Sequence, residues 1–200
     1  MDQLGKILLK AEELFFLNGL KNTSMDDLAK AMGMSKKTLY QFFDNKDDLV
    51  YKTMEHHMAL EKEAINKIVS ESSNAIEELF SIAKHVTGHL KAFNPMVIYD
   101  MQKYYPQAWA LFHNYRDTFI YNLILDNINK GIGQGLYRQD FQPDIIAKIY
   151  CAKSDCIVDP VLFPFTQYNI IALYNEYFRY HIRGIASQEG IKYIEKQKTN

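Results

Sequence analysis

The stretch TSMDDLAKAMGMSKKTLYQFF, residues 23–43, constrains the fold more than any other part of this chain. It contains two short segments of apolar residues at helical spacing, and Gly33 separates them. Thr23 or Ser24 is in position to cap the first segment, and two aspartates follow in its first turn, where the helix dipole favours negative charge. The stretch therefore predicts two short helices joined by a tight turn.

The second of these segments has two different faces. Its apolar residues recur at i, i+3 and i+4: Leu39, Phe42 and Phe43. Ser35 is in position to cap it, and Lys36 and Lys37 follow at the first turn, where the positive end of the helix dipole disfavours lysine. A helix-turn-helix lays such a second helix in the DNA major groove, and lysines there bind phosphates by displacing counterions. The pattern thus suggests a DNA-binding head.

The rest of the chain predicts helices only. A helix upstream of the stretch ends at Asn18-Gly19, two residues that tolerate a left-handed C-cap. A long helix follows from Asp44 or Asn45 to about Ser70, and further helices are expected at about 75–93, 96–104, 106–130, 142–159 and 166–183. The Lys-rich tail after Gly190 is expected to fray. We expect an all-α fold with a DNA-binding domain at 1–46 and a larger helical domain at 47–200.

Composition leaves this interpretation open and excludes others. The formal net charge is −1, so any contact with DNA must come from a local patch. No apolar run approaches the ~20 residues of a membrane span, and the N-terminus lacks the pattern of a secretory signal. Cys151 and Cys156 are too few for a disulfide framework and are expected to be free thiols. These features favour a cytoplasmic protein without a membrane partner.

Residues 7–50, ILLKAEELFFLNGLKNTSMDDLAKAMGMSKKTLYQFFDNKDDLV, resemble the tetracycline-repressor-like (TetR/AcrR) family of bacterial transcriptional regulators. The positions that match the family pattern in order and spacing are Phe15, Gly19, Thr23, Ser24, Leu28, Ala29, Gly33, Ser35, Thr38, Leu39, Tyr40, Phe43, Lys46 and Leu49. The chain departs from the pattern at Phe42, where a smaller polar or His-like residue is common, and at Lys37, where glycine is frequent. The resemblance covers about the first quarter of the chain.

The resemblance implies which residues contact DNA. Thr23, Met25, Tyr40 and Lys46 are expected at backbone phosphates. The residues expected to face the groove are Ser35, Lys36, Lys37 and Thr38. It further implies a transcriptional regulator, most often a repressor, that binds a palindromic operator as a dimer and is released by a small molecule.

In this family the last two long helices pair with those of a second subunit. The corresponding residues here form apolar and aromatic stripes at helical spacing: Ile145, Ile149, Ala152, Cys156, Ile170, Tyr174, Tyr177, Phe178 and His181. A homodimer through these stripes is expected, and a fully intramolecular role for each stripe remains the alternative.

Middle helices of such proteins enclose an effector pocket. The candidate residues in this chain are His85, His89, Phe93, Tyr99, Asp100, Tyr104, Trp109, Phe112, Tyr115 and Phe119, with an effector expected to be apolar or aromatic. His113 is a further candidate polar anchor. Aromatic residues at helical spacing are equally typical of plain core.

Two other functions remain as alternatives. His85 and His89, at i and i+4, share a helix face and suit one metal ion, so a helical metal-binding protein or enzyme is one of them. No glutamate follows the first histidine as in zinc proteases, and no third ligand is evident. The other alternative is an adaptor that has kept the helical fold and lost DNA binding. The main hypothesis remains a regulator without catalytic residues, cofactor or metal.

Overall fold

The structure is a computed structural model that describes residues 2–91 and 93–197. Within those residues every regular element is a helix, and extended backbone pairs only at an isolated antiparallel bridge between Tyr137 and Ala186. The all-α prediction is confirmed. Among the described helices, none combines the length and the apolar character that a bilayer span requires.

The chain divides into two compact units. The first comprises Met1–Lys62 and Ala92–Tyr115, and the second comprises Glu63–Lys91 and Arg116–Asn200. Each unit has its own cluster of buried apolar side chains. The first unit therefore reaches beyond the stretch expected for DNA binding alone, because helices far along the chain share its core.

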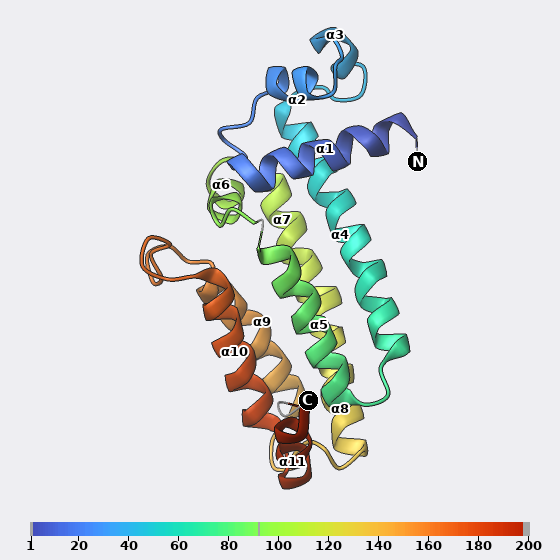
Figure 1. Ribbon diagram of the computed structural model, residues 1–200, viewed down its shortest axis with the longest axis vertical. Coiled ribbons are helices and arrows are strands. Elements are labelled where there is room, and N and C mark those ends of the chain that lie inside the picture. Colours follow the sequence, from blue (N-terminus) through green and yellow to red (C-terminus); the bar gives the residue numbers. More distant parts are fainter. Residues whose placement is uncertain (1, 92, 198–200) are drawn as a thin grey trace. The chain divides into compact units, whose positions relative to one another are not determined.

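The first unit begins with the predicted short helices, which lie together at the blue end of the ribbon in Figure 1. Its elements are α1 (Gln3–Asn18), α2 (Met25–Ala31), α3 (Lys36–Leu39), the first part of α4 (Lys46–Glu71), α6 (Met96–Tyr104) and α7 (Pro106–Tyr115). Gly19 ends α1 with a φ of +88°, a conformation that side chains other than glycine rarely adopt. The predicted end of this helix is confirmed.

Caps fix where the next three helices start. Ser24 accepts a hydrogen bond from the Asp27 backbone N–H at 3.1 Å, while Asp27 accepts one from the Ser24 N–H. Ser35 accepts from the Thr38 N–H at 3.0 Å, and Asn45 accepts from the Asp48 N–H at 2.9 Å. Each cap involves neighbours within one turn, which is why sequence alone predicts them.

The core of the first unit holds α2 and α3 in place. Leu39 and Phe43 are buried in the same cluster as residues of α1 and α2, and Phe42 packs partly buried against it. From later in the chain, α6 adds Val97 and Met101 to this cluster. The apolar side of the recognition segment is thereby anchored, and its other side is left outward.

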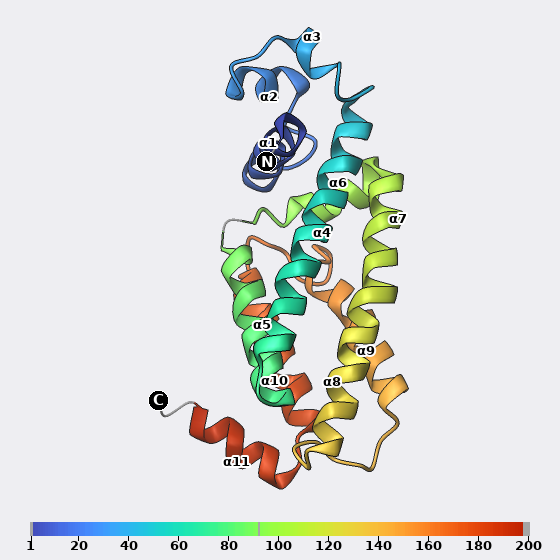
Figure 2. The ribbon, with the colours of Figure 1, turned by 90° about the vertical axis from the view of Figure 1, so that its right-hand side faces the viewer.

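The second unit contains the rest of α4 with α5 (Ala75–Leu90), η1 (Arg116–Ile120), α8 (Tyr121–Gly133), α9 (Pro143–Ile157), α10 (Ile170–Ile185) and α11 (Gln188–Gln197). The π-helix η1 interrupts what the sequence predicts as one helix from Pro106 to about Lys130. α8 and α10 each pack against both α5 and α9. α9 lies beside α10 in Figure 1 and beside α8 in Figure 2.

The expectation of a frayed tail was wrong for residues 191–197, and residues 198–200 lie outside the described residues. Residues 188–197 form the helix α11, with Ile194 only 2% exposed. Tyr193 of this helix accepts a hydrogen bond from the Asn74 side-chain amide at 2.9 Å. Lys192 and Lys196 are exposed, and Ile191, Tyr193 and Ile194 pack on the core of the second unit.

Candidate nucleic-acid interface

The outward side of α3 carries the side chains predicted to face DNA. Ser35, Lys36 and Lys37 are exposed, Thr38 is half-buried, and Tyr40 is 45% exposed. The Ser35 and Thr38 hydroxyls lie 2.8 Å apart and share a hydrogen bond. The surface is therefore polar and basic, and it is carried by a helix whose opposite side is locked into the core.

The two lysines of α3 are not equivalent. The Lys36 Nζ donates to Asp26 Oδ2 of α2 at 2.9 Å, and this hydrogen bond, with the carboxylate's charge, raises the pKa of Lys36. Lys37 has no ion-pair partner among the residues that the structure describes. Lys37 is therefore the ammonium most open to an external anion, while Lys36 must exchange its contact with Asp26 for one with DNA.

Two predicted phosphate contacts require correction. Thr23 is 2% exposed, and its hydroxyl is within hydrogen-bond distance of two backbone oxygens, those of Gly19 at 3.0 Å and Leu14 at 3.3 Å. Met25 is 6% exposed and belongs to the core of the first unit. Their side chains are turned inward, so neither Thr23 nor Met25 offers its side chain to a phosphate.

Lys46 is partly engaged inside the protein. Its Nζ donates to the backbone oxygen of Lys21 at 3.1 Å and lies 5.8 Å from the centre of the Tyr105 ring. Burial lowers the pKa of Lys46, and the nearby carboxylates of Asp100 and others partly offset that shift. Because an ammonium has three donors, a phosphate contact by Lys46 remains a prediction rather than an observation.

Asp100, predicted as an anchor for an effector, has a different place. It lies on α6, is 4% exposed, and its Oδ2 accepts a hydrogen bond from the Lys21 backbone N–H at 2.9 Å. The same oxygen lies 3.3 Å from where a Cβ on Gly19 would stand. Asp100 therefore holds the turn between α1 and α2 from the side of α6, while Lys46 holds the backbone oxygen of the same turn.

Most of the other predicted pocket residues belong to the first unit. Phe93, Trp109, Phe112 and Tyr115 are half-buried side chains packed against its core, and the Trp109 and Phe112 rings stack at 5.6 Å. Tyr99 and Tyr104 lie with lysines instead: Lys103 donates to the Tyr99 hydroxyl at 2.9 Å, and Lys21 to that of Tyr104 at 3.4 Å. The sequence pattern of aromatic residues thus corresponds largely to core and to surface contacts with lysine.

Three predicted pocket residues lie in the second unit. His85 and His89 have ring centres 4.5 Å apart on α5, as the i, i+4 spacing implies. Phe119 of η1 lines a cavity of about 290 Å³ together with residues of α4, α5 and α8. Sequence reasoning missed the polar members of that cavity, because nothing in their local pattern distinguishes them from ordinary surface residues.

The residues predicted at the dimer interface fall into two groups. On α9, Ile145 and Ile149 are 46% and 41% exposed, and Ala152 and Cys156 are exposed on the same face. On α10, by contrast, the side chains already pack within the unit: Ile170, Phe178 and His181 are buried, and Tyr174 and Tyr177 are half-buried. Burial within the unit agrees with the intramolecular alternative for the α10 stripe, and its part in a homodimer stays a prediction.

His181 occupies an unusual place in that interior. It is 9% exposed, its ring lies 4.6 Å from that of Tyr150, and its Nε2 has no hydrogen-bond partner among the described residues. Burial, with a smaller contribution from the charge of Lys153, lowers the pKa of His181 to about 4. The folded chain therefore holds this ring neutral.

We expect this ring to make the protein less stable in acid. Between pH 6.5 and about 4 the unfolded chain binds a proton that the folded ring excludes, so stability is present above this window and is lost as the pH falls through it. Urea unfolding at about pH 7.5 and about pH 5 should show a loss about 2 kcal/mol larger in the wild type than in His181→Phe. Equal losses in the two proteins would show that the ring is not held neutral.

The fold and this surface together define a class of protein. The chain is all-α, and it contains a pair of short, capped helices, α2 and α3. The second of them has a basic and polar outer side, and the remaining helices form the larger part of the chain. This is the architecture of a helix-turn-helix regulator. The family model of bacterial regulatory proteins of the tetR family matches residues 7–51, and the chain belongs to that family of transcriptional regulators.

Comparisons beyond the N-terminal segment agree with this assignment. The chain is 28% identical over 159 residues to an HTH-type transcriptional regulator, YvaF, of Bacillus subtilis. The aligned region covers 78% of this chain and 80% of that protein. It is 25% identical over 147 residues to the HTH-type transcriptional repressor KstR2 of Mycobacterium tuberculosis, covering 71% and 72% of the two chains. The crystal structure of a transcriptional regulator from Cytophaga hutchinsonii shares the fold with a TM-score of 0.74 at 17% identity, over 92% of this chain and 99% of the other.

Proposed function

We propose that this chain is a ligand-responsive repressor that binds a near-palindromic operator as a homodimer. The observation that carries the proposal is the α2–α3 pair, capped at Ser24 and Ser35 and anchored by Phe43, which presents Lys37 and Tyr40 outward. The protein acts by binding DNA and an effector, without a catalytic step, and it acts in the cytoplasm, where bacterial DNA lies. The similarity to KstR2, a repressor, supports repression.

The exposed side of α9 supports the dimer. Ile145, Ile149, Ala152 and Cys156 recur at i, i+4, i+7 and i+11, which places them in one row along the helix. An exposed apolar row is typical of a protein interface, and a two-fold axis makes the same row meet its own copy. Two recognition helices related by such an axis bind half-sites about one DNA turn, ~34–36 Å, apart.

Release by an effector follows from differential affinity. An effector that binds better to a conformation unable to meet both half-sites must weaken DNA binding, and DNA must weaken effector binding by the same factor. The helical metal-binding protein, the enzyme and the adaptor are less well supported, because the relatives named above are transcriptional regulators. The interface on α3 is accordingly the part to test first.

We expect Lys37→Ala to reduce the salt dependence of DNA binding. Each chain then loses one ammonium at the DNA, so the slope of log K against log salt should fall in magnitude by about 2 for a dimer. Lys192→Ala removes the same charge from exposed α11 and should leave the slope unchanged. The measurement is fluorescence anisotropy on a selected palindromic duplex at several salt concentrations, with the binding stoichiometry determined in parallel.

Two results would contradict the proposal. One is an unchanged slope in Lys37→Ala, which would place the α3 surface away from the duplex. The other is a stoichiometry of one chain per palindrome, which would exclude the dimer. A complete lack of affinity for duplexes selected from a random pool would favour the adaptor instead.

A further inference from the structure

The second unit contains a cavity with an unusual polar wall. It measures about 290 Å³ and is lined by the C-terminal part of α4, the first turn of α5, η1 and α8. Its apolar lining consists of Val69, Phe119 and Leu123. This volume lies at the lower end of the range for ligand pockets, about 300–1,000 Å³, so it suits a small molecule with one apolar face.

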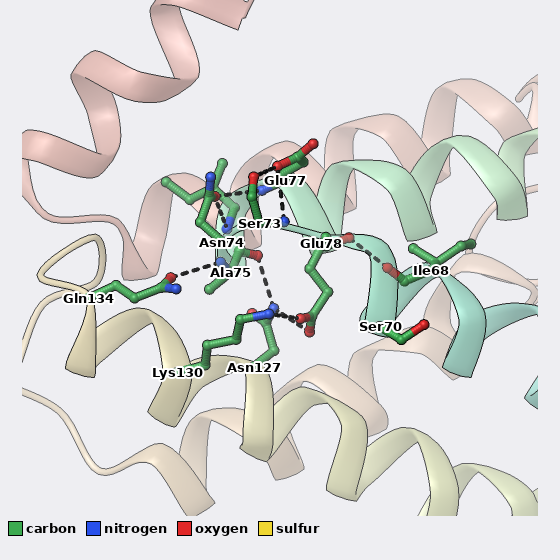
Figure 3. A network of polar contacts seen from close by, with 12 residues as sticks. Ile68, Ser70, Ser73, Asn74, Ala75, Glu77, Glu78, Asn127, Lys130 and Gln134 are labelled. Atoms are coloured by element: carbon green, nitrogen blue, oxygen red, sulfur yellow. Dashed lines mark hydrogen bonds and ion pairs between the residues drawn. The ribbon is translucent and has the colours of Figure 1, made fainter.

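One wall of this cavity is formed by Glu78 with its two partners, Asn127 and Lys130, which are shown in Figure 3. Glu78 is 2% exposed; its Oε1 accepts from the Asn127 amide at 2.8 Å and its Oε2 from the Lys130 ammonium at 2.6 Å. Both carboxylate oxygens of Glu78 are thus occupied, and the charge of Lys130 is compensated. This pair leaves little net field of its own toward a ligand.

A second carboxylate in the lining is not compensated. Asp126 is exposed on α8 at the cavity, and within the described part of the chain no ion pair or hydrogen bond involves it. The side-chain amides of Asn66 and Asn122 line the same cavity and add carbonyl acceptors beside it. With two carboxylates against one ammonium, the cavity has a net negative charge.

These features define the ligand by its chemistry. An anion would be repelled by the uncompensated carboxylate of Asp126, and a neutral apolar molecule would gain nothing from its charge. A small organic cation with an apolar body satisfies both the charge of Asp126 and the surface of Phe119 and Leu123. We propose that the effector is such a cation and that it binds in this cavity, an inference that rests on the proposed regulatory function.

The test uses the full-length protein and matched small molecules. Isothermal titration with 2-phenylethylamine and choline as cations is compared with 2-phenylethanol and phenylacetate, which share the body of the first but are neutral and anionic. At least one cation should bind about tenfold or more tightly than the neutral and anionic compounds. Asp126→Asn should reduce that affinity about tenfold or more, while Asp140→Asn, a surface carboxylate of the same unit outside the cavity, should not.

DNA binding separates failure of this inference from failure of the proposed function. The ligand-free protein is first tested for salt-dependent affinity on a selected duplex, and the cation is then expected to weaken that affinity. Salt-dependent DNA binding without any cation binding, or with a cation affinity that Asp126→Asn leaves unchanged, would overturn the cavity assignment alone. Cation binding that leaves DNA affinity unchanged would overturn its assignment as the effector, and absent DNA binding would overturn the proposed function itself.

Discussion

Gly131→Ala is expected to lower the free energy of unfolding by about 3 kcal/mol, the largest single effect foreseen for this chain. A Cβ at this position would lie 2.6 Å from Cγ of Tyr137 and closer still to two other ring carbons. Tyr137 is 1% exposed, and its hydroxyl lies 3.1 Å from the Ala75 oxygen and 3.0 Å from Asn127 Oδ1. The ring therefore has no room to move without breaking these contacts.

Gly133→Ala supplies the matched control on the same helix. A Cβ at Gly133 meets nothing within 4 Å, so this variant should equal the wild type or be up to about 1 kcal/mol more stable, through its better helix propensity. Urea unfolding of the two variants measures the difference. Equal stabilities would show that α8 and Tyr137 separate more easily than the structure implies.

Asp100→Ala is expected to lower the free energy of unfolding by about 1–3 kcal/mol and to weaken DNA binding. The variant removes the buried acceptor of the Lys21 backbone N–H and loosens the turn that precedes the cap of α2. Asp100→Asn keeps an oxygen acceptor and should lose less on both counts. Urea unfolding and anisotropy on the selected duplex provide the two readouts.

Gln102→Ala, an exposed position on the same α6, controls for a change on that helix surface. It should match the wild type in both measurements. If Asp100→Asn weakened DNA binding as much as Asp100→Ala does, the carboxylate charge rather than the hydrogen bond would be responsible. If neither variant changed DNA affinity, the turn would not position the interface.

The local features of the first 50 residues were predictable because their causes are local. Gly19, Ser24 and Ser35 act on backbone groups within a few residues, and the apolar spacing of Leu39 and Phe43 states which side of α3 faces the core. The same reasoning overstated the outward role of Thr23 and Met25. A family pattern identifies which positions match, but it does not predict side-chain orientation. The Thr23 hydroxyl could point to DNA or to the Gly19 backbone oxygen, and the structure has it at the Gly19 oxygen.

The aromatic residues of the middle region show a second limit. The helical spacing of Trp109 and Phe112 fits a pocket lining as well as it fits a hydrophobic core. In the structure both side chains pack against the core of the first unit. The π-helix η1 and the docked α11 were also not predicted. The π-helix changes the helical spacing over five residues only. The tail after Gly190 was interpreted from its lysines, although Ile191, Tyr193 and Ile194 pack on the core of the second unit.

The sequence by itself determined that this chain is helical, where α1 ends, where α2, α3 and α4 start, and which side of α3 carries lysine, since capping and amphipathic spacing act within a few residues. Only the tertiary structure decided the contacts between residues far apart in the chain. It brings Asp100 to the Lys21 N–H across 79 positions and Lys130 to Glu78 across 52. Such pairings depend on how helices pack, and packing is a property of the whole core that no short stretch of sequence encodes.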